Sequence, residues 1–162
     1  MLIKNNKKAV LAQENKTLRI AIVTSTYYEE ITKNMESACV KFLIKSGVKS
    51  ENIKTFYVPG SWEIPILVQS LAKSKKFDGI AAFGLILKGK TYHFEVLTTQ
   101  CAKALMEISL NTNIPIAFEI LSVYDLEQAR KRTSGKINRG IEGAQALLRT
   151  IHSLGSIASL LE

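Results

Sequence analysis

The sequence predicts a single-domain α/β fold: a three-layer αβα sandwich in which helices cover both faces of a four-stranded, mostly parallel sheet. Two observations lead to it. Short runs rich in β-branched and other apolar residues alternate with longer segments whose apolar residues recur every three or four positions. Strands joined through helices pair in parallel with right-handed crossovers, and both faces of their sheet are buried. The 162 residues, 46% of them hydrophobic, suit one domain with an ordinary core.

Four apolar runs are predicted as the strands. They cover, in chain order, residues 18–24, 53–58, 80–87 and 116–121. Pro59-Gly60 ends the second run, and Asp78-Gly79 leads into the third. Ligands bind such folds beyond the carboxyl ends of the strands. The segments that follow these strands are therefore expected to form a site.

The segments between and after the strands are predicted as helices. They cover about residues 30–46, 62–75, 92–110, 125–132 and 140–152. Gly47 supplies a C-cap for the first, and Pro65 is tolerated because it lies in the first turn of the second. Asp125 and Gln128 form a capping box for the short helix.

The remaining segments set the predicted domain boundaries. Residues 1–16 are polar and lysine-rich and are predicted to form a mobile basic arm. The domain is predicted to span residues 17–153, followed by an apolar tail of residues 154–162. A loop is predicted at residues 133–139.

Composition excludes several classes of function. The net charge is +8, but the lysines are scattered and no aromatic residues alternate with them, so nucleic acid is not the expected partner. No apolar run reaches the ~20 residues of a membrane span, and the first residues lack the apolar core of a signal peptide. Cys39 and Cys101 lie in helical segments and are expected to be buried free thiols. A cytoplasmic location is therefore expected.

The stretch from Gly84 to Glu95 is predicted to bind an anion. It passes from a strand through a turn at Gly89 into a helix, whose first N–H groups are unpaired and lie at the positive end of the helix dipole. The side chains of Lys88, Lys90 and Thr91 add donors. His93 follows in the first helical turn, where a group that titrates near neutrality can serve as an acid or base.

The same stretch also fits the P-loop pattern G-x-x-x-x-G-K-S/T, from Gly84 to Thr91. Leu85 to Leu87 are better suited to the end of a strand than to a loop that wraps phosphate. The later apolar run also lacks the terminal Asp that would hold magnesium. A nucleotide hydrolase is therefore the minor alternative.

Several segments together resemble the lumazine synthase family. Residues 58–65, Val-Pro-Gly-Ser-Trp-Glu-Ile-Pro, are similar to its motif V-P-G-S/A-F/W-E-I-P. Residues 84–95 are similar to G-x-x-I-R/K-G-x-T-x-H-F/Y-D/E, and Asn138-Arg139-Gly140 follows in the family's order. The resemblance covers about residues 17–152. It implies a flavodoxin-like sandwich and a penultimate step of riboflavin synthesis, with no metal or other cofactor.

The resemblance also implies roles for particular residues. It implies that His93 donates and accepts protons in catalysis. The residues that it places around the substrate phosphate are Lys90, Thr91 and, from a neighbouring subunit, Arg132. Those that it places around the pyrimidine and ribityl chain are Tyr27, Ser61, Trp62, Glu63, Leu85, Ile86, Leu87 and, again from the neighbour, Phe118.

The implied reaction and partners are equally specific. A ribityl-substituted diaminopyrimidine-dione condenses with 3,4-dihydroxy-2-butanone 4-phosphate, and phosphate leaves. The implied assembly is a homopentamer with sites between subunits. Assembly into an icosahedral shell is slightly favoured because the loop of residues 133–139 has no long insertion. Riboflavin synthase is a further expected partner.

The sequence departs from the family pattern at several positions. Tyr27-Tyr28 stands where Phe-Asn or Trp-Asn is usual, and Tyr92 stands where Pro is common. Glu119 replaces a common Gly, and Arg139 replaces the usual Lys. The loop before Asn138 is one residue shorter than usual. A non-catalytic flavin- or lumazine-binding shell protein is therefore a second alternative.

Overall fold

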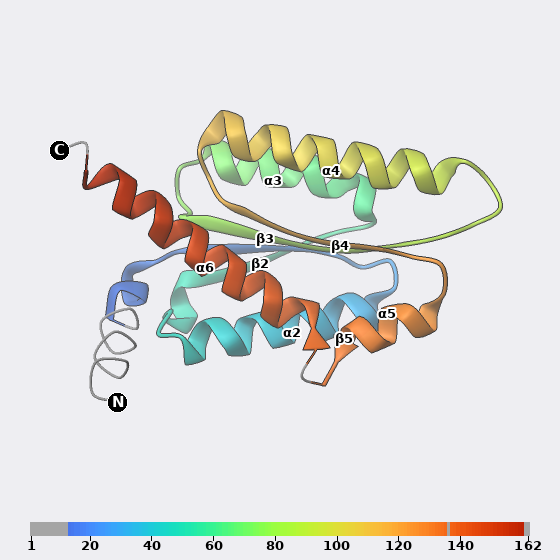
Figure 1. Ribbon diagram of the computed structural model, residues 1–162, viewed down its shortest axis with the longest axis horizontal. Helices are drawn as coiled ribbons and strands as arrows, with labels where there is room; N and C mark the ends of the chain where they lie inside the picture. Colours follow the sequence, from blue (N-terminus) through green and yellow to red (C-terminus); the bar gives the residue numbers. More distant parts are fainter. Residues whose placement is uncertain (1–12, 136, 161–162) are drawn as a thin grey trace.

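A parallel sheet of four strands forms the middle layer of the protein (Figure 1). The computed structural model describes residues 13–135 and 137–160. The strands lie in the order β2-β1-β3-β4, and each neighbouring pair is parallel. Their bounds are Ile20–Ser25 for β1, Ile53–Val58 for β2, Gly79–Leu87 for β3 and Ile116–Val123 for β4. The predicted flavodoxin-like α/β sandwich is confirmed.

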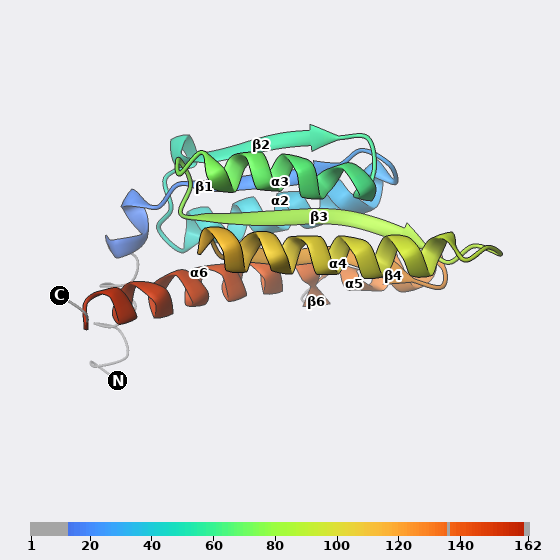
Figure 2. The same cartoon turned by 90° about the horizontal axis from the view of Figure 1, so that it is seen from above.

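Helices cover both faces of this sheet (Figures 1 and 2). The helices on one face are α3 (Ile64–Lys73) and α4 (His93–Thr112). Those on the other are α2 (Glu29–Lys45), α5 (Leu126–Arg132) and α6 (Arg139–Ala158). A hairpin of two short strands, β5 (Thr133–Ser134) and β6 (Ile137–Asn138), joins α5 to α6.

The core consists of two apolar layers, one on each face of the sheet. All six residues of β1 are buried, as are the first eight of β3. These are the two central strands, and burial on both faces explains why their sequences are continuous apolar runs. The edge strands β2 and β4 carry more exposed residues.

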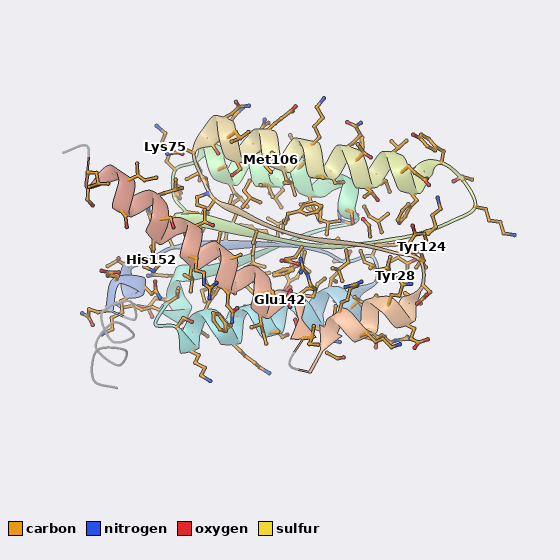
Figure 3. The ribbon with its side chains drawn as sticks, viewed as in Figure 1. Tyr28, Lys75, Met106, Tyr124, Glu142 and His152 are labelled. Atoms are coloured by element: carbon orange, nitrogen blue, oxygen red, sulfur yellow. The ribbon has the colours of Figure 1, made fainter. Side chains whose placement is uncertain are left out.

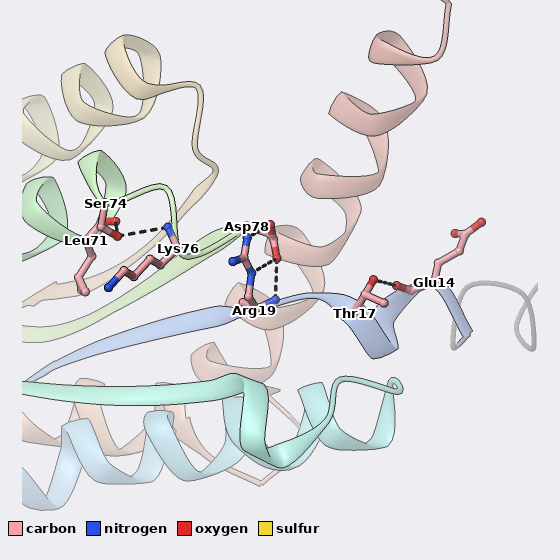
Figure 4. A network of polar contacts seen from close by, with 7 residues as sticks. All are labelled: Glu14, Thr17, Arg19, Leu71, Ser74, Lys76 and Asp78. Carbon is pink, nitrogen blue, oxygen red and sulfur yellow. Dashed lines mark hydrogen bonds and ion pairs between the residues drawn. The ribbon is translucent and has the colours of Figure 1, made fainter.

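An ion pair ties the amino ends of β1 and β3 together (Figure 4). The backbone N–H of Arg19 donates to Asp78 Oδ2 at 2.7 Å, and its guanidinium approaches Asp78 Oδ1 at 3.3 Å. The backbone N–H of Asp78 donates in return to the Arg19 carbonyl at 2.8 Å. This pair aligns the two central strands at the edge opposite to their carboxyl ends.

The chain ends differ from the expectation in two places. Helix α6 continues to Ala158 because nothing after His152 stops it, so much of the predicted tail is helical. Asn15, at the end of the predicted arm, is buried and donates to the Ser46 carbonyl at 2.7 Å. The imidazole of His152 on α6 lies 2.8 Å from Asn15 Oδ1. Residues 1–12 of the predicted arm lie outside the described residues.

Both cysteines are buried free thiols, as expected. Burial raises the pKa of Cys39 to about 12 and that of Cys101 to about 11, so both stay protonated at neutral pH. Within the described part of the chain, no helix has both the length and the apolar character that crossing a membrane requires.

Candidate functional site

The loops that follow β1, β2 and β3 meet at the carboxyl edge of the sheet. Two backbone bonds join the first two loops, from Thr26 N–H to the Val58 carbonyl at 2.8 Å and from Tyr27 N–H to the Pro59 carbonyl at 2.9 Å. A cavity of about 660 Å³ opens between these loops and the start of α4. Eight of the predicted site residues line it: Tyr27, Ser61, Trp62, Leu85, Ile86, Leu87, Thr91 and His93. These eight residues come from separate segments of the chain and line one cavity, and their roles in binding and catalysis stay predictions.

The 3₁₀ turn of Ser61 to Glu63 forms one wall. Ser61 is buried, and its hydroxyl donates to the Leu85 carbonyl at 3.4 Å, which fixes the turn against β3. Trp62 projects outward with 58% of its surface exposed, so its ring is free to contact a ligand. Glu63 accepts the backbone N–H of Gly60 at 3.0 Å and is absent from the cavity lining. In this chain Glu63 therefore holds the turn in shape.

The end of β3 forms the floor of the cavity. Strand β1 pairs with β3 only as far as Phe83, whereas β4 pairs with it as far as Leu87. After Phe83, the backbone N–H and carbonyl groups of β3 that point away from β4 thus have no strand partner. The Leu85 carbonyl is partly used by Ser61. This exposed backbone edge can exchange hydrogen bonds with a planar heterocycle that carries both donors and acceptors.

The turn after β3 and the first residue of α4 form the polar end. His93 is the first residue of α4 and is exposed, and Thr91 lines the cavity with it, whereas the exposed Lys90 is absent from the lining. Lys88 forms an ion pair with Glu95, and its ammonium lies 5.0 Å from the centre of the Phe94 ring. Because Glu95 neutralises Lys88, the donors left for an anion are Lys90, Thr91 and the first N–H groups of α4.

The same geometry contradicts the P-loop alternative. The residues between Gly84 and Lys88 belong to β3, and α4 begins at His93, after the Lys90-Thr91 pair. An extended strand cannot direct successive N–H groups around one phosphate. No group of three His, Cys, Asp or Glu residues suited to a metal ion occurs in the ranges that the structure describes.

Comparison with known proteins identifies the family. The family model described as 6,7-dimethyl-8-ribityllumazine synthase matches residues 17–154. The chain belongs to this family. A 6,7-dimethyl-8-ribityllumazine synthase from Methylobacillus flagellatus is 38% identical over 148 residues, which cover 91% of this chain and 97% of the relative. One of the same name from Leuconostoc mesenteroides is 36% identical over 155 residues, 95% of this chain and 98% of the relative.

Two residues that the lumazine synthase resemblance places in the site lie away from this cavity. Phe118 lies on the edge strand β4, 39% exposed, in a smaller hollow of about 260 Å³ that Met106 and Pro115 also line. Arg132 is the last residue of α5 and is exposed. Neither lines the cavity beside His93. The expectation that a neighbouring subunit supplies both stays a prediction.

The cavity is also lined by residues to which the sequence analysis gave no role of their own. They are Tyr28, Gly60, Gly89, Phe94, Val96 and Leu97. The apolar ones on α4 follow His93 at helical spacing, a pattern that equally fits core residues. Tyr28 precedes α2 in a left-handed conformation with φ of 60°, and its ring meets that of Tyr27 edge-on at 4.7 Å. Figure 3 shows Tyr28 and Tyr124 at the same end of the molecule, far from His152.

Proposed function

We propose that this chain is a lumazine synthase. It condenses 5-amino-6-(D-ribitylamino)uracil with 3,4-dihydroxy-2-butanone 4-phosphate to 6,7-dimethyl-8-ribityllumazine, releasing phosphate and water. The observation that carries the proposal is the layout of the cavity: the donor-bearing turn and His93 at one end, and a strand edge with an aromatic wall at the other. These ends match the two substrates, one a phosphate ester and the other a flat heterocycle.

The heterocycle is held by the strand edge and by stacking. The backbone at Leu85 to Leu87 bonds to the polar edge of the pyrimidine, and Tyr27 supplies a ring face. Tyr27 is 66% exposed, so its ring is available to the ligand. Ser61 and Trp62 border the ribityl chain. Holding both substrates in one cavity converts a bimolecular addition into an effectively unimolecular step, which alone accelerates the condensation.

Proton transfer is the role of His93. The amine of the pyrimidine adds to the ketone, and loss of water gives an imine. Elimination of phosphate, and closure of the second ring with loss of a second water, then require protons to be moved between carbon, nitrogen and oxygen. An imidazole at the helix start lies next to the phosphate site and can take up and return these protons. Lys90 and Thr91 stabilise the phosphate as it leaves.

The site is completed by a second copy of the chain. We infer a homopentamer in which Arg132 of the neighbour reaches the phosphate and Phe118 of the neighbour closes the cavity. Exposed apolar side chains support such an interface, since α4 presents Met106 and Leu110 at 62% and 74% exposure. Assembly of pentamers into a shell, a riboflavin synthase partner and a cytoplasmic location are further parts of this proposal.

One assay tests the activity. Purified protein is mixed with both substrates, and lumazine formation is followed by its absorbance and fluorescence. Accumulation of product above the spontaneous rate supports the proposal. Saturable binding of lumazine with no such acceleration would instead identify a non-catalytic shell protein.

A mixing experiment tests the shared site. Two variants are each expected to be nearly inactive. One is Arg132→Ala, and in the other both His93 and Lys90 are replaced. Unfolded together and refolded into common rings, they should recover about a quarter of the sites. Light scattering must show that mixed rings form. Mixed rings with no recovered activity would mean that Arg132 belongs to the site of its own chain.

A further inference from the structure

A buried acid on β4 is paired with the residue that begins α6. Glu119 is only 5% exposed, and its Oε2 accepts a hydrogen bond from Arg139 Nε at 2.9 Å. A second nitrogen of Arg139 donates to Glu142 Oε2 at 2.7 Å. Gly143 makes room for this acid, because a β-carbon there would lie 2.7 Å from Glu119 Cγ. A buried charge that keeps one strong partner makes a directional link between the two elements it joins.

The link continues from Arg139 to the β5–β6 hairpin, which directly follows Arg132 at the end of α5. Asn138, directly before Arg139, is buried and donates from its side-chain amide to the Thr133 carbonyl at 2.6 Å. Its side-chain oxygen accepts the Gly140 N–H at 2.8 Å. Thr133 and Asn138 also pair directly across the β5–β6 hairpin. Since Arg132 immediately precedes Thr133, its backbone is fixed once Arg139 is fixed.

The other end of the link is rigid. Strand β4 is paired with β3 along its whole length, and Phe83 lies opposite Glu119. The start of α6 is also pressed onto α2, where a β-carbon on Gly140 would lie 2.0 Å from the Met35 carbonyl oxygen. The Glu119–Arg139 pair therefore attaches the end of a short hairpin to a strand that is paired along its whole length.

We propose that Glu119 and Arg139 are positioning residues for the condensation, which hold the hairpin so that Arg132 is presented to the phosphate in the neighbouring subunit. This inference rests on the proposed function. The ion pair is thus the link by which this chain anchors its β5–β6 hairpin to the sheet.

Kinetics of Glu119→Gln separate positioning from simple electrostatics. Burial raises the pKa of Glu119 to about 7, so the assay is run at about pH 8, where the acid is ionised. Loss of a negative charge would tighten phosphate binding if only net charge mattered. Positioning predicts the opposite: a rise of roughly tenfold or more in KM for the phosphate substrate, since small misplacements of binding groups are costly. KM for the pyrimidine should stay within about twofold.

Matched variants complete the design. Glu127→Gln makes the same charge change at an exposed ion pair with Lys131 on α5, close to Arg132, and should leave KM unchanged. Arg139→Met should raise the KM for the phosphate substrate as Glu119→Gln does. In Arg139→Lys this KM should stay close to the wild-type value. The variant with both Glu119→Gln and Arg139→Met should have a KM no higher than that of the poorer single variant, because the two substitutions remove the same link. An unchanged or lower KM in Glu119→Gln overturns the proposal.

Hydrogen exchange tests the link without reference to activity. The amides of Thr133 and Asn138 should exchange several-fold faster in Glu119→Gln than in wild type or Glu127→Gln, while β3 stays protected. Equal exchange in all three proteins refutes the anchoring role. A wild-type protein that makes no lumazine would refute the proposed function, and the exchange rates would still decide whether the pair anchors the hairpin. Arg139→Met serves for the same comparison if Glu119→Gln does not fold.

Discussion

Stability of this fold is expected to fall as pH rises from about 4.5 to about 7, and Glu119 is the cause. Its ordinary pKa is 4.5, and in the folded protein burial raises it to about 7, although Arg139 acts in the opposite direction. Glu142 adds to the increase, and the Cys39 thiol faces the same carboxyl from α2. Between these two pKa values the folded state binds one more proton than the unfolded state, so stability decreases with pH.

The magnitude follows from the two pKa values. A tenfold change in proton affinity corresponds to about 1.4 kcal/mol, so the whole window amounts to about 3 kcal/mol. The stabilisation of the folded state by protonation of Glu119 is fully present below pH 4.5 and is lost above the folded pKa of about 7. Between about pH 5.5 and about pH 8, the wild-type free energy of unfolding should drop by about 2 kcal/mol more than that of Glu119→Gln.

Urea unfolding at the two pH values measures this difference. Both proteins are compared at one concentration, since the stability of an oligomer depends on concentration. Glu127→Gln serves as the control, because its carboxylate is exposed and should leave the wild-type slope intact. Equal slopes for wild type and Glu119→Gln, or a wild-type stability that rises with pH, would refute the reasoning.

Two further predictions concern the site and the packing. His93→Ala should lower turnover at saturating substrates by roughly 10- to 1000-fold, because general acid–base catalysis contributes on this scale. Some turnover should remain, because the cavity still holds both substrates. An unchanged turnover would remove His93 from the mechanism. Gly140→Ala should destabilise the fold by about 3 kcal/mol in urea unfolding, because its β-carbon would lie 2.0 Å from a backbone oxygen of Met35. Gly155→Ala, with nothing within 4 Å, should be neutral or slightly stabilising, and equal losses for the two glycines would contradict this account.

The layered fold could be predicted because its central strands are simple in sequence. β1 and β3 are buried on both faces, so each is mainly apolar in sequence, and only Thr24 and Ser25 at the end of β1 are polar. The strand order β2-β1-β3-β4 could not be predicted in the same way, because alternation of strands and helices fixes direction but leaves several orders open. The end of α6 was placed too early, because the helix continues to Ala158 through Gly155, a residue type that is common just after helix ends.

The site was predictable where its residues follow one another in the chain. Ser61-Trp62 and Thr91 with His93 lie in short turns directly after strands, and such turns converge at one edge of a parallel sheet. The Glu119–Arg139 pair joins residues 20 positions apart on β4 and α6. Only the packing of the helix on the strand reveals it. The small residue Gly143 was the available signal, since it permits that close approach to Glu119.

Tyr28 keeps a backbone conformation that its own side chain opposes. A β-carbon in the left-handed region raises the energy by about 1–2 kcal/mol, and here the φ of 60° persists while the Tyr28 carbonyl accepts the N–H groups of Ile31 and Thr32. Asparagine adopts this conformation more readily. Exchange to asparagine would therefore release conformational strain at the rim of the cavity and remove an aromatic ring from its wall. Selection for a relaxed backbone and selection for the cavity's shape thus act on position 28 in opposite directions.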